Sequence, residues 1–187
     1  MIVGVDEAGR GPLAGVVTAC ALHLVKNPPF SVKDSKALSS LQREKIFDWL
    51  VKEAQFCVGI ADTTEIDKLN ILGATFLAFE RAMQGLLKKS KHLEGAKFII
   101  DGGIFRTKLK VNYVCIDKAD QKIKEVSCAS IVAKVVRDHL MQAAHFLYPE
   151  WNFAKHKGYP TAEHFSLIGK NELTPLHRRS FSPCRQN

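Results

Sequence analysis

Four carboxylates stand where the sequence predicts the ends of strands. Asp6 and Glu7 follow the first apolar segment, Asp101 follows the apolar segment 97–100, and Asp120 comes a few residues after the next one. The ends of strands in a sheet flanked by helices commonly carry functional side chains, because the rigid sheet holds them facing an open crevice. Taken singly, each acid could be a helix cap or a surface charge. The adjacent Asp6-Glu7 pair directly before a glycine-rich turn favours a site.

Carboxylates gathered at one edge of a sheet repel one another unless a cation neutralises them. The pattern pairs no nearby cysteine or histidine with these acids, and hard oxygen ligands favour Mg²⁺ or Mn²⁺ over zinc. Two such ions about 4 Å apart would clamp the attacking and leaving oxygens of an in-line phosphoryl displacement. The acids therefore predict metal-dependent phosphoryl chemistry.

The glycine-rich turn Gly9-Arg10-Gly11 allows two interpretations. With Gly15 its spacing is G-x-G-x-x-x-G, and a strand is expected to follow, so no helix N-terminus is available for a phosphate as in a nucleotide-binding loop. The turn could be a plain hairpin connection. It could equally present backbone N–H groups and Arg10 to a phosphodiester or a sugar hydroxyl.

Two further segments offer weaker signals for nucleic-acid binding. Ser35 and Lys36 provide a hydroxyl and an ammonium group for a phosphate, or belong to a loop with a capping role. Tyr159 stands in a basic turn and could stack on a base or a sugar, although a lone tyrosine more often packs against the protein.

The charge of the chain points in the same direction. Lysine and arginine number 27 against 19 acidic residues, a net charge of +8 with a pI near 9.3. Residues 151–187 carry a net +4. Such a surface favours polyanions, or serves only solubility.

Lys134 and Arg137 could follow a nucleic-acid backbone or face solvent, and residues 177–181 could form a phosphate clamp or a basic tail.

Length and composition predict one globular domain over residues 1–187. The chain has 20.8 kDa, 46% hydrophobic and 25% charged residues, and no apolar run near the roughly 18 residues that span a bilayer. Acidic residues interrupt the first apolar stretch, so no secretory signal is expected.

The five cysteines lack C-x-x-C spacing and indicate free thiols in the cytoplasm, with Cys20, Cys57 and Cys115 buried.

The pattern of apolar residues predicts a mixed sheet flanked by helices. Strands are expected at residues 1–5, 16–22, 55–61, 97–101 and 111–116. Helices are expected from a cap at Ser39 or Ser40 to about 54, from Thr63 or Thr64 to about 91, over 125–147, and from Thr161 to about 170. Gly73 is expected to weaken or divide the second helix.

Taken together, these segments resemble a known family. Residues 6–15, Asp-Glu-Ala-Gly-Arg-Gly-Pro-Leu-Ala-Gly, strongly resemble the opening motif of ribonuclease HII. The match continues in order through Asp34-Ser35-Lys36, Asn70-Ile71-Leu72 with Ala74-Thr75, Asp101-Gly102, Lys118-Ala119-Asp120, residues 129–134 with Arg137-Asp138, residues 156–161 and residues 177–181. The resemblance covers almost the whole chain, and its first motif and the one around Tyr159 are the most specific.

The resemblance implies an α/β ribonuclease H-like fold, a mixed five-stranded sheet with flanking helices and a C-terminal helical, substrate-contacting portion over about 150–187. It implies that the catalytic acids, which also bind the metal, are Asp6, Glu7, Asp101 and Asp120. The metal would be Mg²⁺ or Mn²⁺, with two ions when substrate is bound. It further implies that the ribose 2′-OH is sensed by Gly9, Arg10 and Gly11. Tyr159 would stack on the sugar of the following deoxynucleotide.

The implied reaction is endonucleolytic cleavage of RNA in RNA/DNA hybrids and 5′ of single ribonucleotides in duplex DNA. The products would be a 3′-hydroxyl and a 5′-phosphate, and the role would be removal of ribonucleotides and RNA primers. The 2′-OH is the only local group that separates RNA from DNA, so a turn contacting it supplies selectivity. We expect a monomer with no membrane contact and no evident protein partner.

The chain departs from the family pattern in three places. Val16 replaces a frequent proline and Cys128 a frequent alanine, both changes in packing. Ala119 replaces a frequent glycine and could alter the backbone that holds Asp120. The sister enzyme ribonuclease HIII usually has an added N-terminal domain and a lysine in place of Arg10; this sequence begins five residues before Asp6, so no such domain is expected.

Two rival hypotheses remain at this stage. One is a nuclease or transposase-like enzyme of the same fold with a different nucleic-acid substrate, against which the pairing of the 9–11 turn with Tyr159 argues. The other is a non-catalytic nucleic-acid-binding module, which would not need four acids, because carboxylates near phosphates weaken binding without a cation. Cleavage or stronger binding on addition of Mg²⁺ or Mn²⁺ would separate the hypotheses.

Overall fold

The computed structural model describes residues 1–30 and 38–185 of the chain. Its sheet has the strand order β3-β2-β1-β4-β5. The strands are β1 (Ile2–Ala8), β2 (Val17–Leu24), β3 (Ala54–Ala61), β4 (Lys97–Asp101) and β5 (Asn112–Ile116). Strands β1, β4 and β5 run parallel, whereas β2 is antiparallel to both β1 and β3. The predicted mixed five-stranded sheet is confirmed.

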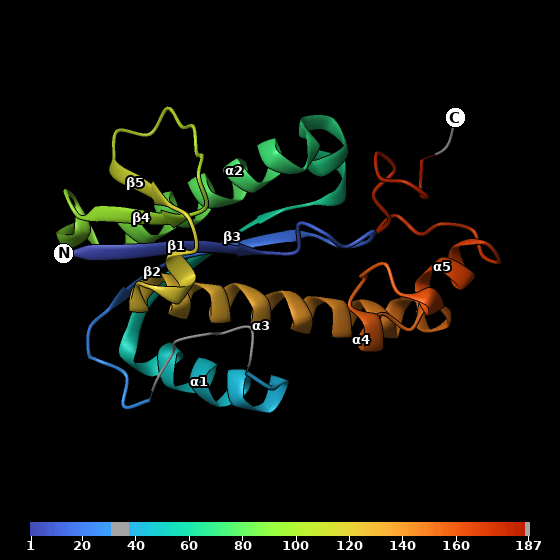
Figure 1. Cartoon of the computed structure of the whole chain (residues 1–187), viewed down its shortest axis with the longest axis horizontal. Helices are drawn as coiled ribbons and strands as arrows, with labels where there is room; N and C mark the ends of the chain where they lie inside the picture. Colours follow the sequence, from blue (N-terminus) through green and yellow to red (C-terminus); the bar gives the residue numbers. More distant parts are fainter. Residues whose placement is uncertain (31–37, 186–187) are drawn as a thin grey trace.

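Helices cover both faces of this sheet. They are α1 (Ser40–Glu53), α2 (Thr63–Lys89), α3 (Lys124–Leu147), α4 (Phe153–His156) and α5 (Ala162–Ile168), with short 3₁₀ turns η1 (Lys91–Leu93), η2 (Ala119–Gln121) and η3 (Pro149–Trp151). In Figure 1 the sheet is seen nearly edge-on, with α2 on one side and α1 and α3 on the other. The short helices α4 and α5 lie beyond the strands at the far end of α3.

Side-chain caps set the starts of three helices. Ser39 caps α1 in a capping box with Gln42, and Thr161 caps α5, as predicted. The start of α2 differs from the prediction. Asp62, rather than Thr63 or Thr64, accepts the N–H of Glu65, whose own side chain returns to the Asp62 backbone.

The long helix α2 is divided, although not at the predicted residue. Asn70 has φ 59° and ψ 170°, which interrupts the helical backbone. Its Oδ1 accepts the N–H groups of Leu72 and Gly73 at 3.0 and 3.1 Å, so it caps a second helical segment. Gly73 therefore lies in the first turn of that segment. Asparagine divides the helix because its short side chain satisfies the freed N–H groups and tolerates positive φ.

Two apolar layers hold the helices against the sheet. One lies between the sheet and α2, and the other between the sheet, α1 and α3. Gly4 on β1 brings α3 unusually close, since a Cβ there would lie 2.2 Å from the backbone carbon of Glu125. This close approach sets the start of α3, and the η2 turn just before it, beside the central strand.

The five cysteines are free thiols, as predicted. Cys20 is buried as expected, but Cys57 and Cys115 are only half-buried, because β3 and β5 are the outer strands of the sheet. Within the described residues, no helix is both long and apolar enough to cross a membrane.

Candidate metal centre and nucleic-acid cleft

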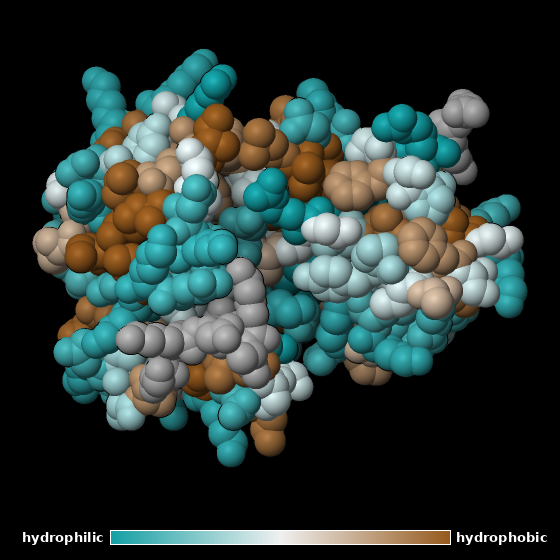
Figure 2. Space-filling view, viewed as in Figure 1, coloured by the Kyte–Doolittle hydropathy of each residue, from teal (hydrophilic) through white to brown (hydrophobic). Residues whose placement is uncertain are grey.

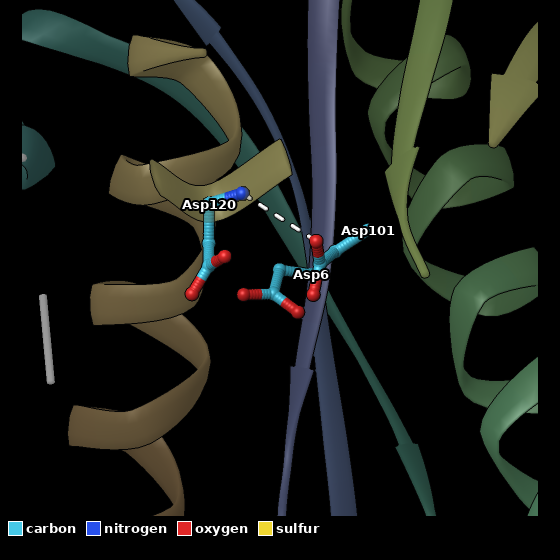
Figure 3. Close-up of side chains that lie close together, drawn as sticks. All are labelled: Asp6, Asp101 and Asp120. Atoms are coloured by element: carbon cyan, nitrogen blue, oxygen red, sulfur yellow. Dashed lines mark hydrogen bonds between the residues drawn. The ribbon is translucent and has the colours of Figure 1, made fainter. Parts of the chain in front are cut away.

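Three of the predicted acids come together at the strand ends. Asp6 on β1, Asp101 at the end of β4 and Asp120 in η2 form the carboxylate triad, in which one oxygen from each lies within 4.8 Å of the others. Figure 3 shows the three side chains converging from these elements. The parallel pairing of Val5 with Ile100 makes Asp6 and Asp101 the next residues on neighbouring strands. Tertiary structure brings in Asp120 through the η2 turn.

Backbone hydrogen bonds position Asp101 against the turn that carries Asp120. Asp101 Oδ1 accepts the N–H of Ala119 at 2.6 Å and that of Asp120 at 3.4 Å; the second bond is the dashed line in Figure 3. The left-handed residue of this turn is Lys118, with φ 55°. Position 119 is fully buried, and alanine there leaves Asp120 within the triad.

The electrostatics of the triad are unfavourable without a cation. Asp6 and Asp120 are 5% and 3% exposed. Burial raises the pKa of Asp6 well above its usual value, and the charges of Glu7 and Asp101 raise it further. The N–H of Glu7, which donates to Asp6 Oδ1 at 2.7 Å, and the side chain of Ser130 offset part of this effect. A hard divalent cation such as Mg²⁺ or Mn²⁺ matches this set of oxygen donors.

Glu7, the fourth predicted acid, lies beside the triad and not within it. Its carboxylate is 3.4 Å from the guanidinium of Arg10 and is 16% exposed. Burial raises the pKa of Glu7, the Arg10 charge opposes the shift, and the Asp101 charge adds to it. Glu7 is therefore close enough to the triad to feel its charge, and it also contacts the glycine-rich turn.

A cleft of about 460 Å³ opens next to these acids. Its lining combines acidic, basic and aromatic side chains with the glycine-rich turn: Glu7, Ala8, Gly9, Arg43, Ser130, Ile131, Lys134 and Tyr159. Figure 2 shows the surface hollowed between the sheet body and the C-terminal portion, with mostly hydrophilic residues around the hollow. The cleft thus joins β1, α1, α3 and the C-terminal portion.

Tyr159 is held at the cleft by polar contacts on its backbone and cations over its ring. Its carbonyl bonds His164 Nδ1 at 3.0 Å. Lys134 Nζ and the Arg137 guanidinium lie 5.3 and 5.4 Å from the ring centroid, within the range of cation–π attraction. The half-buried ring therefore has a defined position.

The glycine-rich turn presents Arg10 and Gly11 to solvent. A Cβ at Gly11 would meet nothing within 4 Å, which makes that side of the turn open. Gly9 has φ +99°, and a Cβ there would lie 2.2 Å from Nε of Arg137. Glycine is needed at position 9 both for its backbone conformation and for the side chain beneath it.

For Arg137 and Arg178 the interpretations drawn from the sequence are wrong. Arg137 and Arg178 are fully buried and donate to backbone carbonyls, so neither a solvated face nor a phosphate clamp describes them. Lys134 is half-buried at the cleft and pairs with Asp138 at 2.7 Å. The predicted phosphate contacts Ser35 and Lys36 lie outside the described residues.

The cleft also contains residues to which sequence reasoning gave no role of their own. Ser130 stands four residues before Lys134 on α3, and this spacing places both on one helix face. This spacing is the feature of the sequence that could have indicated that Ser130 lies at the cleft together with Lys134. Arg43 comes from α1, and nothing in its local sequence indicates that α1 approaches the cleft.

The structure has the fold of the type 2 ribonucleases H. It superposes with a TM-score of 0.77 on a chain of the PCNA:RNase HII complex from Archaeoglobus fulgidus, at 20% identity, covering 100% of this chain and 97% of that one. Bst-RNase HIII, solved in complex with Mn²⁺, gives a TM-score of 0.73 at 18% identity, over 98% of this chain and 68% of that one. These likenesses define the fold class.

Sequence comparison then identifies the family. The family model described as Ribonuclease HII matches residues 3–184. Ribonuclease HII of Thermotoga maritima is 46% identical over 184 residues, covering 98% of this chain and 74% of the relative. That of Shewanella pealeana is 46% identical over 186 residues, covering 98% and 88%. The chain belongs to the ribonuclease HII family.

Proposed function

We propose that this protein is a metal-dependent endoribonuclease that cleaves RNA in RNA/DNA hybrids and cuts 5′ of single ribonucleotides embedded in duplex DNA. The observation that carries the proposal is the carboxylate triad beside a cleft lined by Gly9 and Tyr159. Membership of the ribonuclease HII family supports the same activity. The net charge of +8 suits a polyanionic substrate.

The triad would hold Mg²⁺ or Mn²⁺, with two ions when substrate is bound, and Glu7 would join it as a fourth acid. Bound divalent cations would supply activation of a water and stabilisation of charge on the phosphate. Asp101, fixed by the N–H groups of Ala119 and Asp120, keeps its carboxylate oriented toward the cluster. The water oxygen would bond to phosphorus while the P–O3′ bond to the preceding nucleotide breaks. The water would lose a proton and the departing O3′ would take one up, so that the preceding nucleotide ends in a 3′-hydroxyl and the ribonucleotide carries the 5′-phosphate.

Selectivity would come from the two sides of the cleft. The turn formed by Gly9, Arg10 and Gly11 would contact the ribose 2′-OH, because this hydroxyl alone marks the ribonucleotide. Tyr159 would stack on the next sugar toward the 3′ side. The turn, through Gly9, and Tyr159 line the same cleft. This arrangement supports contact of both with the same RNA–DNA junction.

The biological role that we propose is removal of misplaced ribonucleotides and RNA primers from DNA. We further propose that the protein acts as a cytoplasmic monomer on RNA/DNA hybrids and ribonucleotide-containing duplex DNA. Its free cysteines are consistent with a reducing compartment.

The test is incubation with an end-labelled DNA duplex that carries one ribonucleotide, in Mg²⁺, Mn²⁺ or EDTA. We expect one cut on the 5′ side of the ribonucleotide, with either metal and not with EDTA. The same duplex without the ribonucleotide is the control. Cleavage of only long hybrids would overturn the junction-sensing roles of Arg10 and Tyr159, and tight binding without any cleavage would favour a non-catalytic module.

A further inference from the structure

The backbone of residues 9–16, which contains the glycine-rich turn, is gathered around one buried side chain. Arg178 is 0% exposed. Its Nη2 donates to the carbonyl of Gly9 at 2.6 Å and its Nη1 to that of Arg10 at 2.9 Å. Its Nε donates to the carbonyl of Gly15 at 2.9 Å, and Nη2 also reaches the Val16 carbonyl at 3.3 Å. One guanidinium thus joins the start of the segment to its end.

A second buried arginine also holds the end of the segment. Arg137 is also 0% exposed and donates from Nε to the Val16 carbonyl at 3.0 Å and from Nη2 to the Ala14 carbonyl at 3.1 Å. Within the described residues, neither arginine of this pair forms a salt bridge with a carboxylate. Their guanidinium groups also lie near the rings of Tyr159 and Phe181, whose centroids are 5.4 and 5.1 Å from the guanidinium carbons of Arg137 and Arg178. Burying two such charges without a carboxylate partner is costly, and most of their hydrogen bonds go to the segment 9–16.

The carbonyl contacts determine which way the turn faces. In a trans peptide unit the C=O and the following N–H point in opposite directions. The Gly9 and Arg10 carbonyls point inward to Arg178, and therefore the N–H groups of Arg10 and Gly11 point away from it. Within the described part of the chain, neither N–H donates to a protein group. Arg10 and Gly11 are exposed and the space around a Cβ at Gly11 is open, so a bound substrate can reach these donors.

We propose that Arg178 is a positioning residue, which turns the carbonyls of the glycine-rich turn inward so that the Arg10 and Gly11 N–H groups face the sugar and phosphate of the substrate. The inference rests on the proposed function and adds the origin of its selectivity. Arg178 itself touches no substrate. Without the guanidinium N–H groups of Arg178, the peptide units Gly9–Arg10 and Arg10–Gly11 are free to rotate. The N–H groups that would bind the 2′-OH are then no longer held in one orientation.

The test compares Arg178→Gln with the matched control Arg179→Gln. Arg179 is the adjacent half-buried arginine, and its guanidinium donates to the Leu173 carbonyl at 3.1 Å, away from the turn. Affinities are measured for a duplex with one ribonucleotide and for the same all-DNA duplex, with Ca²⁺ as the only divalent cation and the strands checked to be intact. One hydrogen bond to the 2′-OH corresponds to a preference of about tenfold.

We expect wild type and Arg179→Gln to keep that preference and Arg178→Gln to lose it, with all-DNA binding within about twofold of wild type. An Arg178→Gln protein that keeps the preference would overturn the positioning role. Equal weakening on both duplexes would also overturn it, since that is the signature of a general structural defect. A wild type without any preference would instead remove the ribonucleotide selectivity of the proposed function.

A second measurement does not depend on the folding of a variant. In ¹⁵N-labelled wild-type protein, the outward N–H groups of Arg10 and Gly11 should exchange rapidly with solvent. We expect their exchange to slow, and their resonances to shift, on binding the ribonucleotide duplex more than on binding the all-DNA duplex. Protected N–H groups in the free protein, or identical responses to both duplexes, would overturn the proposal.

Discussion

The carboxylate triad and the arginine pair are two buried clusters of like charge that are stabilised in different ways. Arg137 and Arg178 are enclosed and spread their charge over backbone carbonyls of the same chain. The triad borders a cleft, and burial together with the charges of Glu7 and Asp101 keeps the pKa of Asp6 raised, despite hydrogen bonds from the Glu7 N–H and the Ser130 side chain. Five of the six guanidinium nitrogens of the arginine pair donate to carbonyls, and among the described residues only Arg137 Nη1 has no acceptor. A charge cluster that the backbone largely offsets serves architecture, whereas a carboxylate cluster with unrelieved repulsion beside an open cleft serves ligand binding.

The largest effect should follow from removing a triad charge. Asp101→Asn keeps an oxygen for the Ala119 N–H but loses the negative charge. We expect cleavage of the ribonucleotide duplex to fall by roughly 10³-fold or more, with substrate binding retained, in single-turnover assays. Asp117→Asn, an exposed acid near the same turn, is the control and should cleave normally. Unchanged turnover by Asp101→Asn would remove Asp101 from the site.

Breaking the arginine pair should instead affect stability. Arg137→Met leaves the Ala14 and Val16 carbonyls short of donors. We expect the free energy of unfolding, measured by urea denaturation, to fall by about 3 kcal/mol. The exposed Arg106→Met should change it by less than about 0.5 kcal/mol. If both variants were equally stable, the carbonyl contacts of Arg137 would not contribute to the fold.

A smaller effect is expected at the cleft wall. Tyr159→Ala removes the ring that Lys134 and Arg137 flank, whereas Tyr159→Phe keeps it. We expect the alanine variant to cleave a single-ribonucleotide duplex about tenfold more slowly, with a milder loss on uniform RNA/DNA hybrids. The phenylalanine variant should stay near wild type. An equal loss on both substrates would make Tyr159 a structural residue only.

Neutralising Asp6 should stabilise the metal-free protein. Because the folded-state pKa of Asp6 is raised, its ionisation opposes folding, and this penalty is complete once the pH exceeds that pKa. We expect Asp6→Asn to raise Tm in EDTA at pH 7 by a few degrees, and the difference to shrink as the pH falls toward the usual carboxyl pKa. Mn²⁺ should raise Tm of wild type only. A lower Tm for Asp6→Asn in EDTA would contradict this account.

The smallest effect concerns three buried histidines of the C-terminal portion, His156, His164 and His177. Burial lowers all three pKa values, that of His177 to about 4 with help from the His164 charge. Stability that depends on neutral imidazoles is complete above the unfolded pKa near 6.5 and is lost as the pH falls through the lower folded values.

The loss of stability around these histidines at low pH can be followed by the fluorescence of Trp151, whose ring centroid lies 4.2 Å from that of His177. Trp49→Phe leaves Trp151 as the only tryptophan. We expect the emission to change between pH 6 and 4, before the far-ultraviolet circular dichroism of the whole fold changes. Emission that stays constant until global unfolding would show that the histidines do not weaken this region.

Most of the secondary structure could be predicted because its determinants are local. Short runs rich in β-forming apolar residues marked the strands, and the Ser39 and Thr161 hydroxyls marked two helix starts. The break in α2 was misplaced at Gly73. Asparagine at position 70 acts through a side-chain hydrogen bond, which propensity alone does not reveal.

The sequence by itself determined the family, the strand–helix order and the acids that could bind metal, because these follow from residue types and their spacing along the chain. Only the tertiary structure decided that Asp120 joins Asp6 and Asp101 while Glu7 stays beside Arg10. It also decided that Arg178 lies beneath the turn and not on the surface. The physical reason is that the burial of a charge depends on partners distant in sequence: Arg178 and the Gly9 carbonyl are 169 residues apart in the chain.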